Sequence, residues 1–356
     1  MKKSVKKVKS SSAGKKSGTK SPRAKKAALP KAANIPVTSL GDAHKRGGIF
    51  TFKDMYTLAP VNILEATLTS KSGVQEGKDR GLAPQAHKVV EHGVYVLEFD
   101  LNANLAHRTG ATDKDAMVAL QLMPLAYSCN PSRVRNGANV TIRGFWLFVH
   151  DNPLYSLQPT ELMKLVRPTL KNKEPKSWED YQSPKLNKVK ADLAQLTKKV
   201  TVYDLKTKLM DDADSIQEIL NGKSLKRCSG CLIIEVDHAN LNGDPANAGS
   251  PRQNSDGTGW ATDVSFKRKL RDLVGEKENE SVWSQVRKII KISNTDDKEH
   301  YQILEKRDRV RSEVVKLIKT GVDKFHYQNW DARLFGNTFL DKKVEETPES
   351  IEEDAE

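Results

Sequence analysis

The sequence predicts an α+β fold, and three observations support this prediction. Apolar runs with alternating polar positions, such as GVYVLEFDL at 93–101, are typical of β-strands. Segments in which a capping residue precedes apolar side chains at helical spacing, such as the one after Thr112, are typical of α-helices. Strand, helix and strand then follow one another along the chain, separated by polar segments, as in an α+β domain.

The first half of the fold is predicted at 45–181. Thr112 is expected to cap a helix, with Asp113 and Asp115 in the first turn, where the helix dipole favours carboxylates. The long polar segment around 69–90 is expected to form a protruding loop or hairpin. Strands are expected at 47–52, 60–69, 93–101 and 139–151, and helices at 113–123 and 158–166. Within 93–101, Val94, Val96 and Leu97 are expected near one buried layer.

A joining segment is predicted at 182–226 and the second half of the fold at 227–340. The joining segment contains two weakly amphipathic stretches, which predict short helices at 185–196 and 211–220. The second half opens with a buried strand, CLIIEV, followed by the loop Asn240–Arg252 (NLNGDPANAGSPR). A basic helix at 262–272 and another helix at 306–322 are expected after this loop.

The basic helix has two different faces. Each residue of an α-helix is rotated by 100° from the one before it. With this spacing, one side of the helix is an apolar stripe that is expected to pack against the core, and another side presents three cations. Phosphate binding and a plain solvated surface are both compatible with such a face, and the preceding polar loop favours phosphate binding. The apolar stripe contains Phe266, Leu270, Leu273 and Val274, and the cations are Lys267, Arg268 and Arg271.

The two ends of the chain carry opposite charge. Residues 1–46 contain 14 basic residues and one acidic residue, which accounts for the formal net charge of +13, whereas 341–356 contains eight acidic residues and two lysines. Both ends have too few apolar residues to offset the entropy cost of ordering, so we predict a disordered basic tail at 1–44 and a disordered acidic tail at 341–356. Attraction to phosphates, targeting and solubility are all open roles for the basic tail.

The cysteine content predicts a reducing, cytoplasmic location. Three cysteines in 356 residues argue against a secreted disulfide scaffold, and no apolar run is long enough to cross a membrane. Cys228 and Cys231 have C-x-x-C spacing, but a second pair is missing and His238 is poorly placed to complete a site, so neither a metal nor another cofactor is predicted. Cys129 is expected in the core.

Candidate catalytic groups occur only around the loop. Asp237, His238 and Asp244 are close in sequence, and such groups act as bases or metal ligands near a phosphate. Asp and Asn in a Gly- and Pro-rich loop are more often turn formers, so no catalytic residue is predicted and Asp244 is kept as the alternative. The fingerprints of nucleotide-binding loops are absent from the sequence.

Long ordered motifs in this chain resemble the guide-RNA-binding backbone subunit of type I CRISPR Cascade complexes, especially types I-C and I-B. The motif LIIEVDHANLNGDPANAGSPRQNSDGTGWATDVSFKRKLRDLV resembles the family's N-terminal strand, loop and basic helix, and WDARLFG resembles a later segment. The segments from KRGGIFTF to EPKSWEDY resemble the family's C-terminal half, although Gly48 and Ala59 replace its usual Pro and Asp. Because the halves occur in reversed order, the resemblance implies a circular permutation, with both tails emerging from nearly the same place.

The resemblance implies a modified RNA-recognition-motif (ferredoxin-like) palm with an antiparallel sheet, helices on one face, and finger and thumb extensions, the thumb being near 69–90. It also implies that copies of the chain oligomerise along a guide RNA (crRNA), which pairs with a target nucleic acid, and that other Cascade-type subunits join them in antiviral defence. A sequence-neutral binder of this kind contacts phosphates rather than base edges. The RNA-binding residues implied are Asn242, Gly243, Lys267, Arg268, Arg271, Arg333, Arg80, His87, Lys88, Arg133 and Arg135.

Two other function classes remain open at this point. Related type III backbone subunits cut target RNA with a loop aspartate, which makes Asp244 the residue of interest. Alternatively, the chain is an architectural nucleic-acid-binding protein driven by its basic tail. A non-enzymatic RNA-binding subunit is favoured because the ordered motifs span both halves of the chain.

Overall fold

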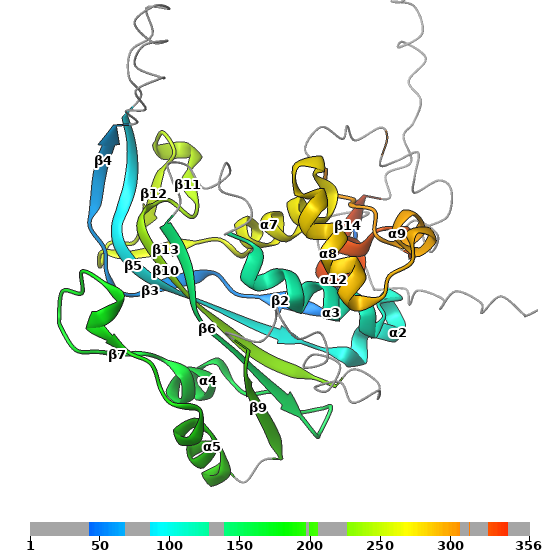
Figure 1. Ribbon diagram of the computed structural model, residues 1–356, viewed down its shortest axis with the longest axis horizontal. Coiled ribbons are helices and arrows are strands. Elements are labelled where there is room, and N and C mark those ends of the chain that lie inside the picture. Colours follow the sequence, from blue (N-terminus) through cyan, green and yellow to red (C-terminus); the bar gives the residue numbers. More distant parts are fainter. Residues whose placement is uncertain are drawn as a thin grey trace, which may run out of the picture.

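A computed structural model describes residues 43–67, 86–127, 139–196, 199–205, 226–306, 313 and 327–340. Its centre is a ten-stranded sheet in which every pairing is antiparallel, with helices packed against it (Figure 1). The predicted α+β class is therefore confirmed. Within the described residues, no helix has the length and apolar character needed to cross a membrane.

Fourteen strands are described. The main sheet has the order β11-β12-β13-β3-β5-β10-β6-β9, and β2 and β4 also pair with β5. The strands are β1 (Ala43–Gly47), β2 (Phe50–Phe52), β3 (Met55–Pro60), β4 (Ile63–Thr67), β5 (Ala86–Leu101), β6 (Asn139–His150), β7 (Thr169–Leu170), β8 (Tyr181–Gln182), β9 (Val200–Asp204), β10 (Cys228–Ala239), β11 (Gly243–Asp244), β12 (Ser250–Gln253), β13 (Thr258–Ala261) and β14 (Gly336–Leu340).

The described helices connect and cover these strands. They are α2 (Ala106–Thr109), α3 (Asp113–Leu122), α4 (Pro159–Val166), α5 (Leu186–Gln195), α7 (Asp263–Gly275), α8 (Glu280–Ile290), α9 (Asn294–His300) and α12 (Trp330–Phe335). Short 3₁₀ turns lie at Ala103–Leu105, Met123–Leu125, Trp178–Asp180, Pro245–Asn247 and Lys277–Asn279.

The central strand β10 joins the two halves of the chain. It pairs with β5 from Cys228 opposite Leu101, and with β6 from Cys228 opposite Val149. Both neighbours precede it by many residues in the sequence. The halves at 45–181 and 227–340 therefore share one sheet and cannot be separate domains.

The sheet has a buried apolar layer on each face. One layer contains Leu97 of β5 and packs under α3, α7, α8 and α12, while the other contains Val94 and Val96 and packs under α4 and α5 (Figure 1). Because successive side chains of a strand point to opposite faces, Leu97 does not share a layer with Val94 and Val96, and that prediction was wrong. Helices were expected on one face of the sheet only, but the structure has them on both faces. The helices on the second face shield its apolar side chains from water.

Local sequence signals account for α3 and α7. Thr112 caps α3, since its hydroxyl accepts a hydrogen bond from the Asp115 amide while the Asp115 carboxylate accepts one from the Thr112 amide, as predicted from the capping residues. In α7, the predicted apolar stripe is buried at Phe266, Leu270 and Leu273. The helix therefore packs on the side that its periodicity indicates.

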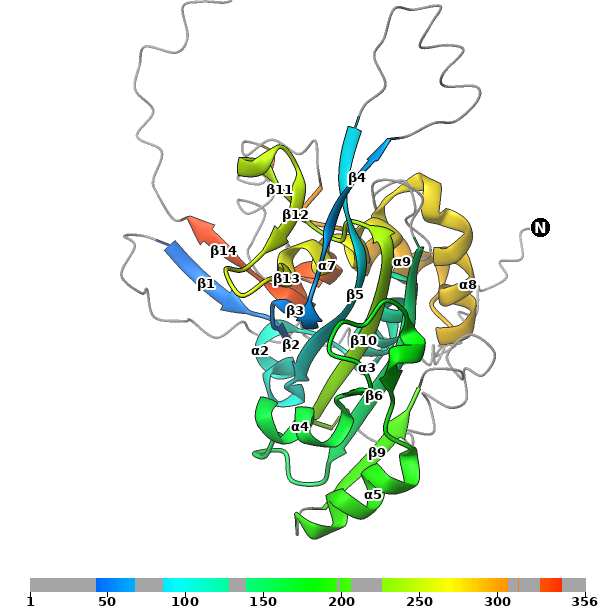
Figure 2. The same cartoon turned by 90° about the vertical axis from the view of Figure 1, so that its left-hand side faces the viewer.

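The two ends of the described chain lie side by side. β1 and β14 form a separate antiparallel pair in which Ala43 is opposite Leu340 and Gly47 is opposite Gly336 (Figure 2). This pairing agrees with the expectation that both tails leave the fold at nearly the same place.

The predicted joining segment at 182–226 is partly built into the fold. It contributes α5, which contacts the second layer through Val189 and Leu193, and β9, which pairs with β6 at the edge of the sheet. The helix predicted at 211–220 and nearly all of the one predicted at 306–322 lie outside the described residues.

Candidate nucleic-acid interface

The loop after β10 is closed by its own polar side chains. Asn240 donates from Nδ2 to the Gly249 carbonyl oxygen over 2.9 Å, and its Oδ1 accepts from the Asn242 amide over 3.1 Å. The two ends of the loop are thereby held together, as expected where Asn provides backbone-like hydrogen bonds in a turn.

Gly243 sits where no side chain fits. A Cβ atom at this position would lie 2.5 Å from the Gly249 carbonyl oxygen, well inside van der Waals contact. Gly243 also pairs with Pro251 across β11 and β12. The close approach of two backbone segments therefore requires glycine here.

Asn242 attaches the loop to the first turn of α7. Its Oδ1 accepts hydrogen bonds from the backbone amide and the hydroxyl of Thr262, over 3.0 and 3.1 Å. Thr262 in turn caps the helix by accepting from the Ser265 amide, and the Ser265 hydroxyl donates to the Leu241 carbonyl oxygen. The loop and the helix N-terminus thus form one rigid unit.

A groove of about 930 Å³ lies between this loop and α7. It is open to solvent, and its walls combine backbone of the loop with charged side chains of the helix. Three cations and one carboxylate contribute to its lining, which makes it a suitable size and charge for a phosphate-bearing chain. The lining includes Asn240, Asn242, Gly243, Gly249, Thr262, Ser265, Arg268, Lys269, Arg271 and Glu305.

The three predicted cations of α7 all have carboxylate partners. Lys267 lies 2.6 Å from Asp263, and Arg268 lies 2.8 Å from Asp272, both as i,i+4 pairs. The face of α7 is therefore less electropositive than its sequence pattern suggests, because each positive charge is partly neutralised.

Arg271 is the most enclosed of the three. Its Nε lies 2.8 Å from Asp331, and its guanidinium carbon lies 5.3 Å from the centre of the Phe335 ring. These contacts tie α7 to α12 and hold Arg271 at the wall of the groove.

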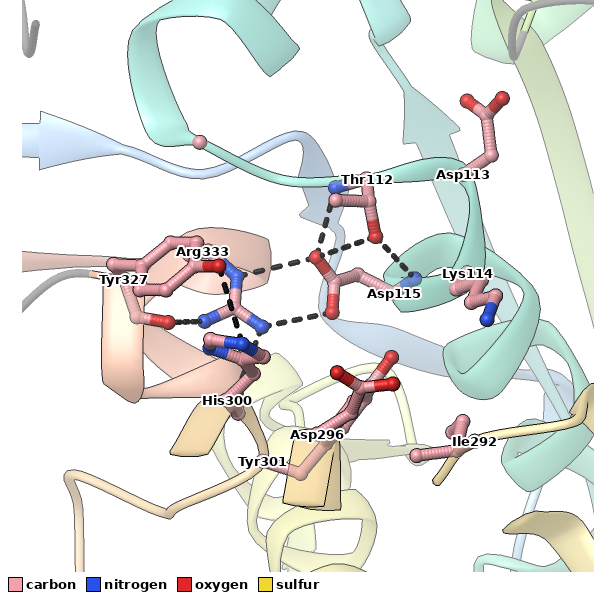
Figure 3. Close-up of a pocket in the computed structure, with 11 residues that line it drawn as sticks. Thr112, Asp113, Lys114, Asp115, Ile292, Asp296, His300, Tyr301, Tyr327 and Arg333 are labelled. Atoms are coloured by element: carbon pink, nitrogen blue, oxygen red, sulfur yellow. Dashed lines mark hydrogen bonds and ion pairs between the residues drawn. The ribbon is translucent and has the colours of Figure 1, made fainter. Parts of the chain in front are cut away.

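Arg333 lies in a different place from the groove. Its side chain is only 2% exposed, and it makes an ion pair with Asp115 through both carboxylate oxygens, at 3.1 and 2.8 Å (Figure 3). It also donates to the carbonyl oxygens of His300 and Tyr327 beside a cavity of about 440 Å³. These buried contacts favour a structural role for Arg333 over the predicted contact with RNA.

The other predicted contacts are on separate parts of the molecule. His87 and Lys88, near the end of the thumb predicted at 69–90, lie on β5 opposite Ala66 and Glu65 of β4. Arg80, Arg133 and Arg135 lie outside the described residues.

The three candidate catalytic side chains take part in two separate sets of contacts. The Asp237 carboxylate contacts the neighbouring His238 ring at 2.6 Å. Asp244 instead accepts from the Ala246 amide and lies 3.8 Å from Arg252, which is the arrangement of a turn former. Among the described residues, no group of three or more His, Cys, Asp or Glu side chains could hold a metal ion.

The C-x-x-C pair is part of the core. Cys228 belongs to the layer under α3 and α7, whereas Cys231 belongs to the layer under α4 and α5, so the thiols lie on opposite faces of the sheet. Burial raises the pKa of Cys228 to about 12 and also raises the pKa of Cys231. These two cysteines therefore suit neither a zinc site nor a redox pair. Cys129 is outside the described residues.

Two residues that shape the interface were not predicted from the sequence. Thr262 was identifiable, because a threonine directly before a helical pattern is a common N-cap. Asn240 gave no comparable signal, because its partner Gly249 is nine residues away.

The chain was compared with protein families and with curated proteins. None of the curated proteins matches the chain. A sequence model of the family described as CRISPR-associated protein Cas7 matches residues 226–351, the part that contains β10, the loop and α7. This match supports the interpretation of the chain as a CRISPR-associated backbone subunit that binds RNA.

Proposed function

We propose that this chain is the crRNA-binding backbone subunit of a type I surveillance complex, of the I-C or I-B kind, and that copies of it assemble along the RNA with other Cascade-type subunits. The observation that carries the proposal is the coincidence of the Cas7 match with the groove between the loop and α7. Pairing of the bound guide with a target nucleic acid is part of the same proposal.

The groove suits contact with an RNA backbone. Its loop side offers main-chain groups held in place by Asn240 and Asn242, and its helix side offers cations. Lys267 and Arg268 are already paired with carboxylates, so a phosphate would exchange one anionic partner for another without ordering a new side chain. Binding of this kind is independent of base sequence, as a guide-RNA carrier requires.

The sheet supports a circularly permuted ferredoxin-like palm. We follow the chain from β10 to its C-terminal end and then continue from its N-terminal end. The main elements met on this path are, in order, β10, α7, β3, β5, α3 and β6. In the sheet, β10 lies between β5 and β6. This is the β-α-β-β-α-β arrangement with a split β-α-β unit. The Cas7 match covers 226–351, whereas both neighbours of β10 come from outside it.

We propose a role without catalysis, because Asp244 is used as a turn former. The alternative is target-RNA cleavage by a type III-like mechanism. Incubating the assembled protein with guide, target RNA and Mg²⁺ separates the two. We expect intact target with both the natural chain and Asp244→Ala, and cleavage that Asp244→Ala abolishes would contradict the proposal.

The RNA groove is tested by one lysine and a matched control. Lys267 and Lys188 each pair with an aspartate four residues away in a helix, at 2.6 Å in both cases, but only Lys267 belongs to α7, the helix that lines the groove through Arg268, Lys269 and Arg271. Removing one phosphate contact lowers the slope of log affinity against log salt by about 0.7 for a single strand. We expect Lys267→Ala to show this decrease and Lys188→Ala to show none.

Purification of the assembly provides the direct test of the partner. A discrete, repeat-containing small RNA should accompany the protein, and sequencing should identify it. A protein that purifies without RNA and fails to bind an added guide would contradict the proposed function.

A further inference from the structure

Three large polar and aromatic side chains form a row across neighbouring strands at one end of the sheet. Arg252 of β12 is opposite Trp260 of β13, and Trp260 is opposite Tyr56 of β3. Residues opposite one another in antiparallel strands project to the same face and are close neighbours. The row therefore spans three strands on one face.

This face is the one that carries the second apolar layer. Tyr56 is also opposite Val96, which is buried under α4 and α5, whereas the adjacent residues Met55 and Ala261 are buried in the other layer. Tyr56 is nevertheless 48% exposed. The cover provided by α4 and α5 thus ends before it reaches the row.

The row has the features of a stacking surface. The Arg252 guanidinium carbon lies 4.8 Å from the centre of the Trp260 ring, so the two planar groups are in contact. The Arg252 Nε is buried and has no hydrogen-bond partner among the described residues. Tyr56 then extends the aromatic surface toward solvent on the next strand.

Positive charge borders the aromatic pair on two sides. Arg252 lies at one end, and the exposed Arg167, which follows α4, donates to the Leu58 carbonyl oxygen on the strand of Tyr56. Arg252 also lies 3.8 Å from Asp244, so the row is continuous with the loop of the candidate interface.

We propose that Tyr56, Trp260 and Arg252 form a platform on which unpaired bases of single-stranded RNA stack. Bases stack on aromatic rings and on guanidinium planes whatever their identity, and flanking arginines suit the adjacent phosphates. The inference rests on the proposed function, because it requires RNA in the neighbouring groove. It adds a contact with bases to a site otherwise built for the backbone.

A protein partner is less well matched by this surface. A surface that docks a protein is typically a contiguous apolar patch with polar residues around it. The row contains none of the exposed large aliphatic residues of the described chain, which are Leu64, Leu154, Leu170 and Val264. The two arginines favour a polyanion instead. Self-association through this face is an outcome that the experiment must detect.

The test compares ordinary and abasic single-stranded RNA of equal length. The full chain and three variants are measured: Trp260→Ala, Trp260→Phe as the ring-preserving variant, and Leu154→Ala as a control at a highly exposed apolar position outside the row. Trp260→Ala should weaken binding of ordinary RNA about fivefold or more, because a base–aromatic stack contributes roughly this much. Trp260→Phe and Leu154→Ala should bind as the natural chain does.

Three further measurements test the platform, and the first two distinguish stacking from charge. The natural chain should bind abasic RNA more weakly than ordinary RNA, and Trp260→Ala should lose this preference. The slope of log affinity against log salt should not change in Trp260→Ala, because no phosphate contact is removed. RNA carrying 4-thiouridine should also cross-link to the peptide that contains Trp260 or Tyr56.

The outcomes separate this inference from the proposed function. Equal binding of ordinary and abasic RNA by the natural chain would overturn the platform while leaving RNA binding intact. Absence of any RNA binding would overturn the proposed function and the platform together. Loss of self-association of the RNA-free protein in Trp260→Ala, with unchanged RNA affinity, would show that a second copy occupies the row and would also overturn the platform.

Discussion

At the scale of single residues, Arg333 shows why the partners of a charged side chain are difficult to predict from sequence. The segment DARLFG predicted an RNA contact, but the side chain pairs with Asp115, which is 218 residues away in the chain. Asp115 also accepts from the Thr112 amide, so the carboxylate that completes the capping box of α3 also anchors α12 (Figure 3). No local pattern can reveal a partner at that separation.

This ion pair should matter for stability. Removing one partner of a buried pair leaves an uncompensated charge, so Arg333→Ala should lower the free energy of unfolding by about 3–5 kcal/mol. Lys188→Ala, which removes an exposed i,i+4 pair, should cost about 0.5 kcal/mol or less. Urea unfolding of both variants measures the difference. A similar small loss in both would show that the Arg333 contacts contribute little.

The same variant separates structure from binding. We expect that Arg333 makes no phosphate contact. Under conditions where Arg333→Ala remains folded, its RNA affinity should therefore depend on salt with the same slope as that of the natural chain. If Arg333→Ala instead lowers the slope of log affinity against log salt, as expected for Lys267→Ala, Arg333 contacts an RNA phosphate as the sequence predicted.

At the scale of secondary-structure elements, patterns with a short range were the most predictable. The capping residues located α3, the apolar stripe located the buried side of α7, and the alternating segments located β5 and β6. None of the three ion pairs was predicted. Those of Lys267 and Arg268 lie within α7 and were identifiable from their i,i+4 spacing, whereas the pair of Arg271 with Asp331 depends on how α7 packs against α12. The sequence thus identified the groove's elements but overstated its free positive charge.

The loop depends on its glycine, which a pair of alanine substitutions can test. Gly243→Ala places a Cβ atom 2.5 Å from the Gly249 carbonyl oxygen, so the loop must move, at a cost of about 1–3 kcal/mol. Gly47→Ala is the control, since a Cβ atom there meets nothing within 4 Å. We expect Gly243→Ala to lower the melting temperature and weaken RNA binding, with Gly47→Ala near the natural chain. Equal behaviour of the two variants would show that the loop tolerates a side chain.

At the scale of the whole molecule, the sheet is built from strands of both halves of the chain. The central strand β10 takes its neighbours β5 and β6 from the other half, and both buried layers contain residues from both halves. Strand order depends on contacts between segments far apart in sequence, so composition and periodicity could not supply it. In the sequence, the only indication that strands from the two halves lie side by side was the reversed order of the motifs.

The proposed circular permutation is tested by a variant in which the chain is relinked in the order that the proposal takes as unpermuted. In the variant, residues 1–42 and 341–356 are removed, Leu340 is linked to Ala43 through a two-residue Gly-containing turn, and the chain is opened between Leu205 and Lys226. Ala43 and Leu340 are opposite one another in an antiparallel pair, a separation of about 5 Å that a two-residue hairpin loop can span.

The relinked variant should fold with a free energy of unfolding within about 1 kcal/mol of the unlinked chain 43–340, because every strand of the main sheet keeps its neighbours. Urea unfolding and guide-RNA affinity of the two proteins provide the comparison. Since α5 and β9 stay attached to β6, their contacts with the second layer are also preserved. A relinked chain that fails to fold, while the unlinked chain folds, would show that the order β10, α7, β3, β5, α3 and β6 does not describe an intact palm.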